Sequence, residues 1–245
     1  MQPTKFVKPK SLKDTQHNYC PGCGHGIIHR IVAEVVDELN IREKTIGVAP
    51  VGCAVFAYDY WNFDVTEAAH GRPPAVATGI KRVLPDRIVF TYQGDGDLAA
   101  IGTAEIIHAA NRSENITVIF VNNTVYGMTQ GQMAPTTLPG QKTLTTPYGR
   151  EVSRDGYPLK VCELLSVLEG ARFIARGMVT DPKNVMLTKS YIKKAFLTQI
   201  ENKGFSLVEV LSMCPSGLHM SVLETKNWIE NELTKFFPLG VYKDV

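Results

Sequence analysis

Two short polar motifs follow predicted strands and have the composition of a site for phosphate and a cation. The apolar run Arg87–Tyr92 leads into Gln93–Asp97, which reads Gln-Gly-Asp-Gly-Asp. Its glycines allow a sharp turn and the close approach of a ligand, and the N-terminus of the helix predicted to follow favours phosphate oxygens. The Asp95 carboxylate would repel a diphosphate unless a divalent cation lay between them. Mg²⁺ is commonly held by one or two protein groups together with substrate phosphates.

The second motif comes after the next predicted strand. Ile116–Val121 ends in Asn122 and Asn123, and 25 residues separate Gly96 from Asn122. That length accommodates one helix and one strand. Because parallel strands end at the same edge of a sheet, Asp95 and Asn123 are predicted to meet there.

The chain has five cysteines, an odd number that argues against a disulfide framework. Cys20 and Cys23 form a Cys-Pro-Gly-Cys motif, which is compatible with a zinc knuckle, a redox pair or part of an iron–sulfur site.

Two further cysteines lie just beyond the ends of predicted strands. Cys53 follows Thr45–Ala49, and Cys214 follows Leu207–Leu211. With the Cys-Pro-Gly-Cys pair they make a plausible set of four thiolates, which suits either zinc or a [4Fe–4S] cluster. Cys162 begins an amphipathic helix and is predicted to be a buried small hydrophobe.

Helical and strand patterns alternate along the chain, as in a mainly parallel sheet. The predicted helices are His25–Asn40, Pro74–Leu84, Asp97–Asn111, Val161–Leu168, Val185–Asn202 and Ser221–Phe237. The predicted strands are Thr45–Ala49, Arg87–Tyr92, Ile116–Val121, Arg172–Arg176 and Leu207–Leu211. We therefore expect an α/β fold with helices on both faces of the sheet. One domain is expected over residues 1–245, with an N-terminal arm (1–18) and a long active-site loop (122–154).

Composition excludes several other classes. Hydrophobic residues make up 44% of the 245 residues and charged residues 20%, as in soluble globular proteins. The net charge is only +2, with Lys5, Lys8, Lys10 and Lys13 near the start, so nucleic-acid binding is not expected. The sequence shows neither a secretory signal pattern nor an apolar run long enough to span a membrane, and a cytoplasmic location without membrane contact is expected.

The Gly-Asp-Gly and Asn-Asn pair resembles the thiamine diphosphate motif, and the motifs together resemble the β subunit of the 2-oxoacid:ferredoxin oxidoreductases. The similarity covers nearly the whole chain and is greatest to short subunits of the 2-oxoglutarate or branched-chain 2-oxoacid type. The segments that carry it are Tyr19–Gly26, Val51–Cys53, Ala69–Arg72, Gln93–Asp97 and Asn122–Thr129.

This resemblance implies cofactors and their ligands. Mg²⁺ would be bound by Asp95, Asn123 and the Val125 carbonyl. A [4Fe–4S] cluster would be bound by Cys20, Cys23, Cys53 and Cys214. The residues implied around thiamine diphosphate are Gly52, Cys53, His70, Gly94, Asp95, Gly96, Asp97, Asn123, Val125, Tyr126, Gly127, Met128 and Thr129. His70 and Arg72 are candidates for catalytic roles.

The resemblance also implies a reaction and partners. The reaction is the coenzyme A-dependent oxidative decarboxylation of a 2-oxoacid to an acyl-CoA, carbon dioxide and reduced ferredoxin. The partners would be an α subunit, γ and ferredoxin-like δ subunits, and ferredoxin, in two copies of a heteromer. The glutamate that activates thiamine is implied to lie on the α subunit, so this chain is expected to be catalytically incomplete.

Two alternatives and one departure accompany this interpretation. The alternatives are a non-oxidative thiamine decarboxylase or carboligase with a structural zinc, and a non-catalytic interaction module on an inactive thiamine fold. Where the family commonly has Gly-Gly-Gln after Met-Thr, this chain has Gln130-Gly131-Gln132. If position 130 requires a glycine conformation, Gln130 is expected to be strained.

Overall fold

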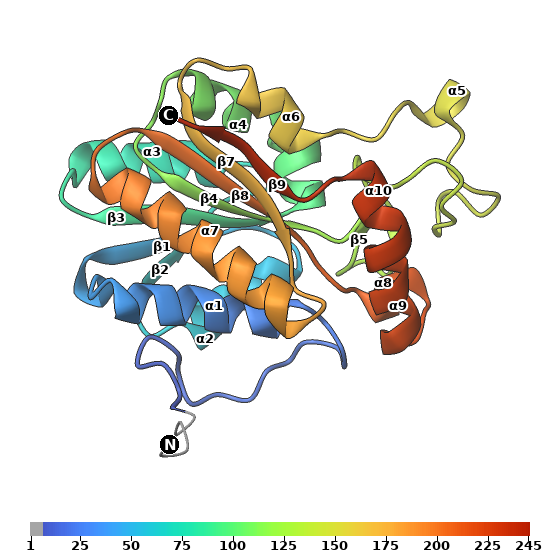
Figure 1. The fold of residues 1–245 in the computed structure, drawn as a ribbon, viewed down its shortest axis with the longest axis horizontal. Coiled ribbons are helices and arrows are strands. Elements are labelled where there is room, and N and C mark those ends of the chain that lie inside the picture. The colour runs from blue at the N-terminus through green and yellow to red at the C-terminus, as the bar shows by residue number, and fades with distance from the viewer. Residues whose placement is uncertain (1–6) are drawn as a thin grey trace.

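The computed structural model describes residues 7–245 and is built around a seven-stranded sheet (Figure 1). The strand order is β2-β1-β3-β4-β8-β7-β9, and all neighbouring strands are parallel except the antiparallel pair β7 and β9. The strands are β1 (Thr45–Ala49), β2 (Asp64–Glu67), β3 (Ile88–Gly94), β4 (Thr117–Asn122), β7 (Ala171–Met178), β8 (Phe205–Leu211) and β9 (Gly240–Asp244). The expected α/β class with a mainly parallel sheet is confirmed.

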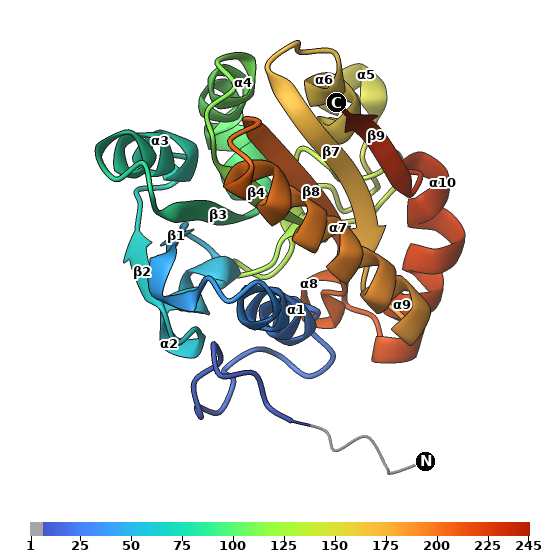
Figure 2. The same cartoon turned by 60° about the vertical axis from the view of Figure 1, so that its left-hand side comes forward.

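Helices cover both faces of the sheet (Figure 2). On one face, α1 (His25–Glu38), α2 (Ala57–Tyr60) and α7 (Pro182–Ile200) share a core with strand residues such as Phe90, Ile119 and Val208. On the other, α3 (Pro73–Val83), α4 (Thr103–Asn111) and α6 (Val161–Ser166) pack against Val89, Val118 and Leu207. Alternate residues of the same strands thus face opposite cores, which explains why these strands read as continuous apolar runs.

Local signals account for several helix boundaries. Helix α3 begins at Pro73, where a missing backbone N–H has no cost. Helix α7 has Asp181 as its N-cap, whose side chain accepts a hydrogen bond from the Asn184 backbone N–H at 3.1 Å. The predicted helix Asp97–Asn111 is divided at Gly102 into a π-helical turn, η3 (Asp97–Ile101), and α4.

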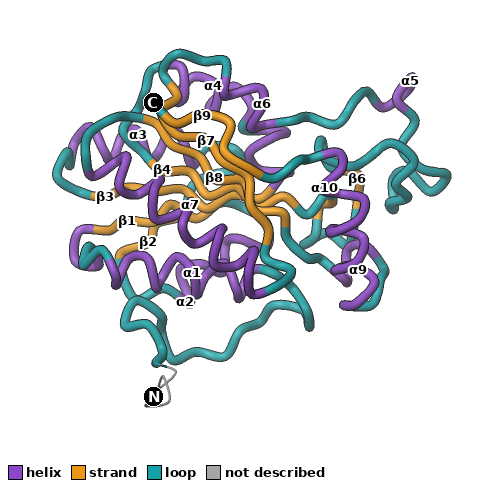
Figure 3. Tube along the Cα trace, viewed as in Figure 1, coloured by secondary structure: helices purple, strands orange, loops and turns teal. Residues whose placement is uncertain are grey.

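Most of the remaining short elements lie beyond the carboxyl edge of the sheet (Figure 3), whereas η1 (Arg42–Lys44) directly precedes β1 at the opposite edge. Within residues 122–154 the structure forms a small antiparallel hairpin of β5 (Val125–Tyr126) and β6 (Gln132–Met133) and a helical turn, α5 (Val152–Asp155). The others are η2 (Cys53–Phe56), α8 (Pro215–Leu218), α9 (Val222–Trp228), η4 (Ile229–Leu233) and α10 (Thr234–Phe236). The last three follow one another over most of the helix predicted for Ser221–Phe237.

The described part of the N-terminal arm is attached to the domain. The Ser11 hydroxyl donates to the Asp37 carboxylate at 2.6 Å, and Lys13 Nζ donates to the Tyr58 carbonyl at 2.9 Å. Lys8 pairs with Asp14, while Lys5 lies outside the described residues. Within residues 7–245, no helix has both the length and the apolar character needed to cross a bilayer.

Candidate cofactor cleft and cysteine cavity

A cleft of about 210 Å³ opens at the carboxyl ends of β1, β3 and β4. Its position agrees with the strand order, because β2 and β3 lie on opposite sides of β1 and ligands of open α/β sheets bind where the order reverses. The lining includes every residue predicted to surround the cofactor: Gly52, Cys53, His70, Gly94, Asp95, Gly96, Asp97, Asn123, Val125, Tyr126, Gly127, Met128 and Thr129. His25, Val51 and Ala54 also line it.

Asp95 is a buried carboxylate surrounded by neutral donors. The backbone N–H of Gly96 donates to its Oδ1 and the hydroxyl of Thr136 to its Oδ2, both at 2.9 Å. Burial raises the pKa of Asp95 to about 7, because an ionised carboxylate is poorly solvated there. A divalent cation would remove this penalty, so the site fits the expected Mg²⁺. Sequence reasoning missed Thr136, whose irregular loop carries no periodic signal.

Asn123 lies beside Asp95 because β3 and β4 are adjacent and parallel, with Gly94 opposite Val121. Its side-chain oxygen accepts a hydrogen bond from the Val125 backbone N–H at 3.2 Å. An amide oxygen has two lone pairs, so this bond leaves acceptor capacity for a cation. The predicted convergence of Asp95 and Asn123 at one sheet edge is thus realised.

Two glycines provide open space in the cleft. A methyl group added to Gly94 or Gly52 would have no protein atom within 4 Å, although both residues line the cleft. By contrast, a methyl group on Gly96 would lie 2.1 Å from the Tyr126 ring, so packing inside the protein requires that glycine. The unfilled space beside Gly94 suits the close approach of a phosphate to the backbone.

Asp97 binds the neighbouring His70–Gly71 loop. Its carboxylate accepts hydrogen bonds from the Gly71 backbone N–H at 2.8 Å and from Gln93 Nε2 at 2.7 Å, and it contacts His70 Nδ1 at 2.5 Å. The Asp97 side chain therefore holds His70 at the cleft. Arg72 instead forms an ion pair with Glu105 of α4 and is absent from the lining residues of the cleft.

A second cavity, of about 240 Å³, contains the four cysteines predicted as ligands, Cys20, Cys23, Cys53 and Cys214. It shares five lining residues with the first cleft: His25, Cys53, Asn123, Gly127 and Met128. Cys162 lies elsewhere and is fully buried in the apolar core, which confirms its prediction as a buried residue.

Gly127 leaves space between two of the sulfurs. A methyl group at this position would lie 3.2 Å from the Cys214 sulfur and 3.7 Å from the Cys53 sulfur. Burial raises the pKa of Cys23 to about 11 and that of Cys214 to about 12. These thiols are therefore protonated at neutral pH until a metal displaces their protons.

The four cysteines do not form a preformed metal centre in this structure. In residues 7–245, no group of three or more His, Cys, Asp or Glu side chains is arranged to hold a metal ion. A tetrahedral zinc requires four ligands at about 2.0–2.3 Å from one centre. Four thiolates around a cavity are suited to a larger group whose metal atoms each take one thiolate.

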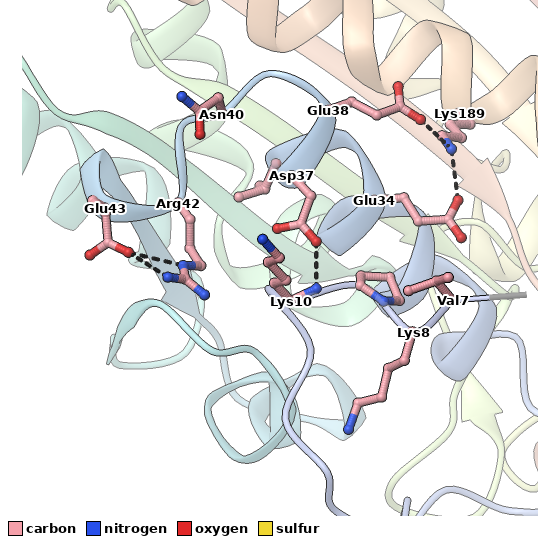
Figure 4. A pocket seen from close by; sticks show the side chains of 12 residues that line it. Val7, Lys8, Lys10, Glu34, Asp37, Glu38, Asn40, Arg42, Glu43 and Lys189 are labelled. Carbon is pink, nitrogen blue, oxygen red and sulfur yellow. Dashed lines mark hydrogen bonds and ion pairs between the residues drawn. The ribbon is translucent and has the colours of Figure 1, made fainter.

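A wider groove of about 540 Å³ runs between α1 and the N-terminal arm (Figure 4). Lys189 bridges Glu34 and Glu38 at 2.7 Å each, and Arg42 pairs with Glu43 at 2.8 Å. Because these charges neutralise one another, the groove is a poor candidate for an anionic cofactor.

Comparison with known proteins agrees with this geometry. Residues 50–210 match the family described as "Thiamine pyrophosphate enzyme, C-terminal TPP binding domain". Ketoisovalerate oxidoreductase subunit VorA of Methanothermobacter thermautotrophicus is 49% identical over 97% of this chain and 52% of its own length. 2-Oxoglutarate synthase subunit KorB of Methanocaldococcus jannaschii is 41% identical over 82% of this chain and 70% of its own length.

A solved structure of a 2-oxoacid:ferredoxin oxidoreductase has a similar fold. The 2-oxoglutarate:ferredoxin oxidoreductase from Magnetococcus marinus, described with 2-oxoglutarate, coenzyme A and succinyl-CoA bound, superposes with a TM-score of 0.79. The match has 26% identity and covers all of this chain and 87% of that one. This chain belongs to the thiamine pyrophosphate enzyme family, within the group formed by the subunits of 2-oxoacid:ferredoxin oxidoreductases. It spans about half the length of the VorA relatives.

Proposed function

We propose that this chain is the thiamine diphosphate-binding β subunit of a 2-oxoacid:ferredoxin oxidoreductase. The complete enzyme would convert a 2-oxoacid and coenzyme A to an acyl-CoA and carbon dioxide while reducing ferredoxin. The observation that carries the proposal is the wall shared by two cavities, one containing a buried carboxylate and the other four cysteines. A cofactor that releases electrons and a group that accepts them would be direct neighbours there.

The first cavity would hold the diphosphate end of thiamine diphosphate. Asp95, Asn123 and the Val125 carbonyl would bind Mg²⁺, and the open side of Gly94 would admit the phosphates. When bound, thiamine diphosphate supplies an electron sink for decarboxylation. His70, held by Asp97, is in position to contact the cofactor or substrate.

The second cavity would hold a [4Fe–4S] cluster on Cys20, Cys23, Cys53 and Cys214. Four thiolates that line one cavity suit a [4Fe–4S] cluster, and a structural zinc on the same cysteines is the alternative. The raised thiol pKa values mean that cluster insertion would release protons.

A branched-chain 2-oxoacid is the substrate that we propose. The VorA relatives, named for ketoisovalerate, are more similar to this chain than the KorB relative from Methanocaldococcus jannaschii. Of the apolar segment 54–58, Ala54 lines the cleft and Phe56 lines the cysteine cavity. This lining suits an aliphatic side chain better than a second carboxylate.

The proposal includes partner subunits. Thiamine enzymes use a glutamate on the aminopyrimidine ring, and we place that residue on an α subunit. Glu105 is paired with Arg72 away from the cleft, so it is a poor substitute. We propose γ and ferredoxin-like δ subunits as further partners, and ferredoxin as the electron acceptor. The complete enzyme would contain two copies of this heteromer and would be located in the cytoplasm.

Anaerobic purification with and without the partner subunits tests this function. We expect about four irons and four acid-labile sulfides per chain, and 2-oxoacid-dependent ferredoxin reduction only with the partner and coenzyme A. In a substrate panel, 2-oxoisovalerate should exceed 2-oxoglutarate in kcat/KM. A colourless protein containing zinc would instead support a non-oxidative thiamine enzyme. Failure to bind thiamine diphosphate, even in the complex, would support the interaction module.

A further inference from the structure

A buried arginine on β7, next to the edge strand β9, has a hydrogen-bond partner on each nitrogen of its guanidinium group. Arg176 of β7 is fully buried; its Nε donates to Glu209 at 2.8 Å and its Nη2 donates to Glu163 at 2.6 Å. Its Nη1 donates to the Pro238 carbonyl at 3.1 Å and to the Tyr242 hydroxyl. Since a buried charge is tolerated only when it is paired, these bonds hold the guanidinium in one position.

The second carboxylate oxygen of Glu209 forms a hydrogen bond on the side of the cofactor cleft. Glu209 is also fully buried, and its Oε1 accepts a hydrogen bond from Asn122 Nδ2 at 2.7 Å. Arg176 lies opposite Glu209 on neighbouring strands, whereas Asn122 is the last residue of β4. One carboxylate thus connects the ion network to the strand end that carries the predicted Mg²⁺ ligands.

The amide of Asn122 is fixed in one orientation by this contact. With Nδ2 directed to Glu209, its Oδ1 accepts a hydrogen bond from the Thr124 backbone N–H at 3.2 Å. Thr124 has a φ of +65°, a left-handed conformation that is strained for a β-branched residue. The turn that presents Asn123 and Val125 is therefore strained and is held by Asn122.

We propose that Glu209 is a positioning residue for the Mg²⁺–diphosphate site and acts through Asn122. Arg176 serves as the counterion that holds the Glu209 carboxylate in this orientation. This inference rests on the proposed function, because it concerns how the chain prepares the site for its cofactor.

The hydrogen-bond pattern makes a specific prediction for Glu209→Gln. Glu209 accepts from Arg176 Nε–H at one oxygen and from Asn122 Nδ2–H at the other, with the Cys162 thiol also beside it, whereas a glutamine has one side-chain oxygen. Either one donor is left unpaired, or the Asn122 amide turns over and faces the Thr124 N–H with its own NH₂ group. We expect the affinity for thiamine diphosphate with Mg²⁺ to fall about tenfold, the loss associated with one buried hydrogen bond.

The double variant Glu209→Gln/Asn122→Asp should restore the pairing of hydrogen-bond donors with acceptors. The new aspartate accepts from the new glutamine and from the Thr124 N–H, which leaves the glutamine oxygen for Arg176. A negative charge moved nearer to the diphosphate should weaken binding by electrostatics alone. The two explanations therefore predict opposite changes in cofactor affinity. If Glu209 acts by positioning, the double variant binds thiamine diphosphate more tightly than Glu209→Gln, and if it acts by charge alone, the double variant binds more weakly.

The experiment is a titration with thiamine diphosphate and Mg²⁺ on the anaerobically purified complex, with thermal unfolding of the cofactor-free protein measured in parallel. The expected order of affinity is wild type, then the double variant, then Glu209→Gln. A double variant that binds no more tightly than Glu209→Gln overturns the inference. A wild type that does not bind thiamine diphosphate would contradict the proposed function instead.

Two further variants keep the test decisive if Glu209→Gln does not fold. Asn122→Ala leaves the Arg176–Glu209 pair intact and should still weaken cofactor binding about tenfold. Thr117→Val removes a buried hydroxyl at the opposite end of the same strand, where it bonds to Gln199 at 2.9 Å. It should lower the midpoint of unfolding and leave cofactor affinity unchanged. Equal affinities for wild type and Asn122→Ala would refute the positioning role.

Discussion

The buried carboxylate of Asp95 accepts a hydrogen bond from the hydroxyl of Thr136 at 2.9 Å. Asp95 follows β3, whereas Thr136 belongs to the long irregular segment after β4. The same segment is attached at Thr137, whose hydroxyl donates to the Thr124 carbonyl at 2.5 Å. The base of the loop is therefore part of the wall around the proposed Mg²⁺ site. Movement of this loop would change the hydrogen bonding of the metal ligands.

Gly94→Ala should separate cofactor binding from folding. The added methyl group meets no protein atom within 4 Å but enters the cleft, so we expect little change in stability and a loss of thiamine diphosphate affinity of tenfold or more. Calorimetric titration and thermal unfolding measure the two effects. Gly79→Ala is the control, because Gly79 has equally open surroundings on α3; it should raise stability by about 0.5–1 kcal/mol and leave binding unchanged. Normal binding by Gly94→Ala would show that the phosphates lie elsewhere.

Replacing one cavity cysteine should remove the cluster. Cys214→Ser takes away one of four thiolates, and we expect the iron content to fall well below about four per chain with loss of visible absorbance. Iron and sulfide analysis of anaerobically purified protein measures this. Cys162→Ala is the matched control, because Cys162 is buried in the apolar core away from the cavity. Full iron content in Cys214→Ser, or its loss in Cys162→Ala, would contradict the ligand assignment.

The strain expected at position 130 is present. Gln130 has a φ of +79° and its side chain is exposed, so its backbone conformation favours glycine. Gln130→Gly should therefore increase the free energy of unfolding by about 1 kcal/mol, measured in urea. Gln130→Ala retains the Cβ atom and should show no such gain. A gain of equal size in both variants would mean that the side chain, rather than the backbone, is responsible.

His29 should make the fold sensitive to acid. It is fully buried, and burial lowers its pKa well below the ordinary value of 6.5. Its aromatic and titratable neighbours are His17, Tyr19, His25, Tyr60, Trp61 and Tyr92. A depressed histidine pKa contributes stability above 6.5 that is lost as the pH falls below it, because the unfolded chain takes up the proton more readily.

His29→Gln should therefore reduce the loss of stability between about pH 7 and about pH 5. Urea unfolding at several pH values gives the difference between the variant and the wild type. His108→Gln, which changes an exposed side chain on α4, should leave the wild-type pH profile unaltered. If His29→Gln has the same pH dependence as the wild type, protonation of His29 does not limit stability in acid.

The sequence alone was sufficient to predict which residues meet where the polar residues directly follow neighbouring parallel strands. Asp95 and Asn123 stand at the ends of two apolar strands separated by one helix, and parallel pairing then requires them to meet. The strands β2 and β9 were missed for a related reason. They lie at the two edges of the sheet, where partial exposure removes the continuous apolar pattern that marks a buried strand.

Tertiary structure decided which distant side chains act together. Cys53 and Cys214 are 161 positions apart, and only the packing of the loops after β1 and β8 brings them to one cavity. The same holds for Thr136 beside Asp95, for Glu209 beside Asn122, and for the Arg72–Glu105 pair that draws Arg72 away from the cleft. Local periodicity reports which face of an element is buried, whereas contacts between loops depend on how the finished sheet places its ends. The chain thus encodes its cofactor motifs locally and completes the site through long-range packing.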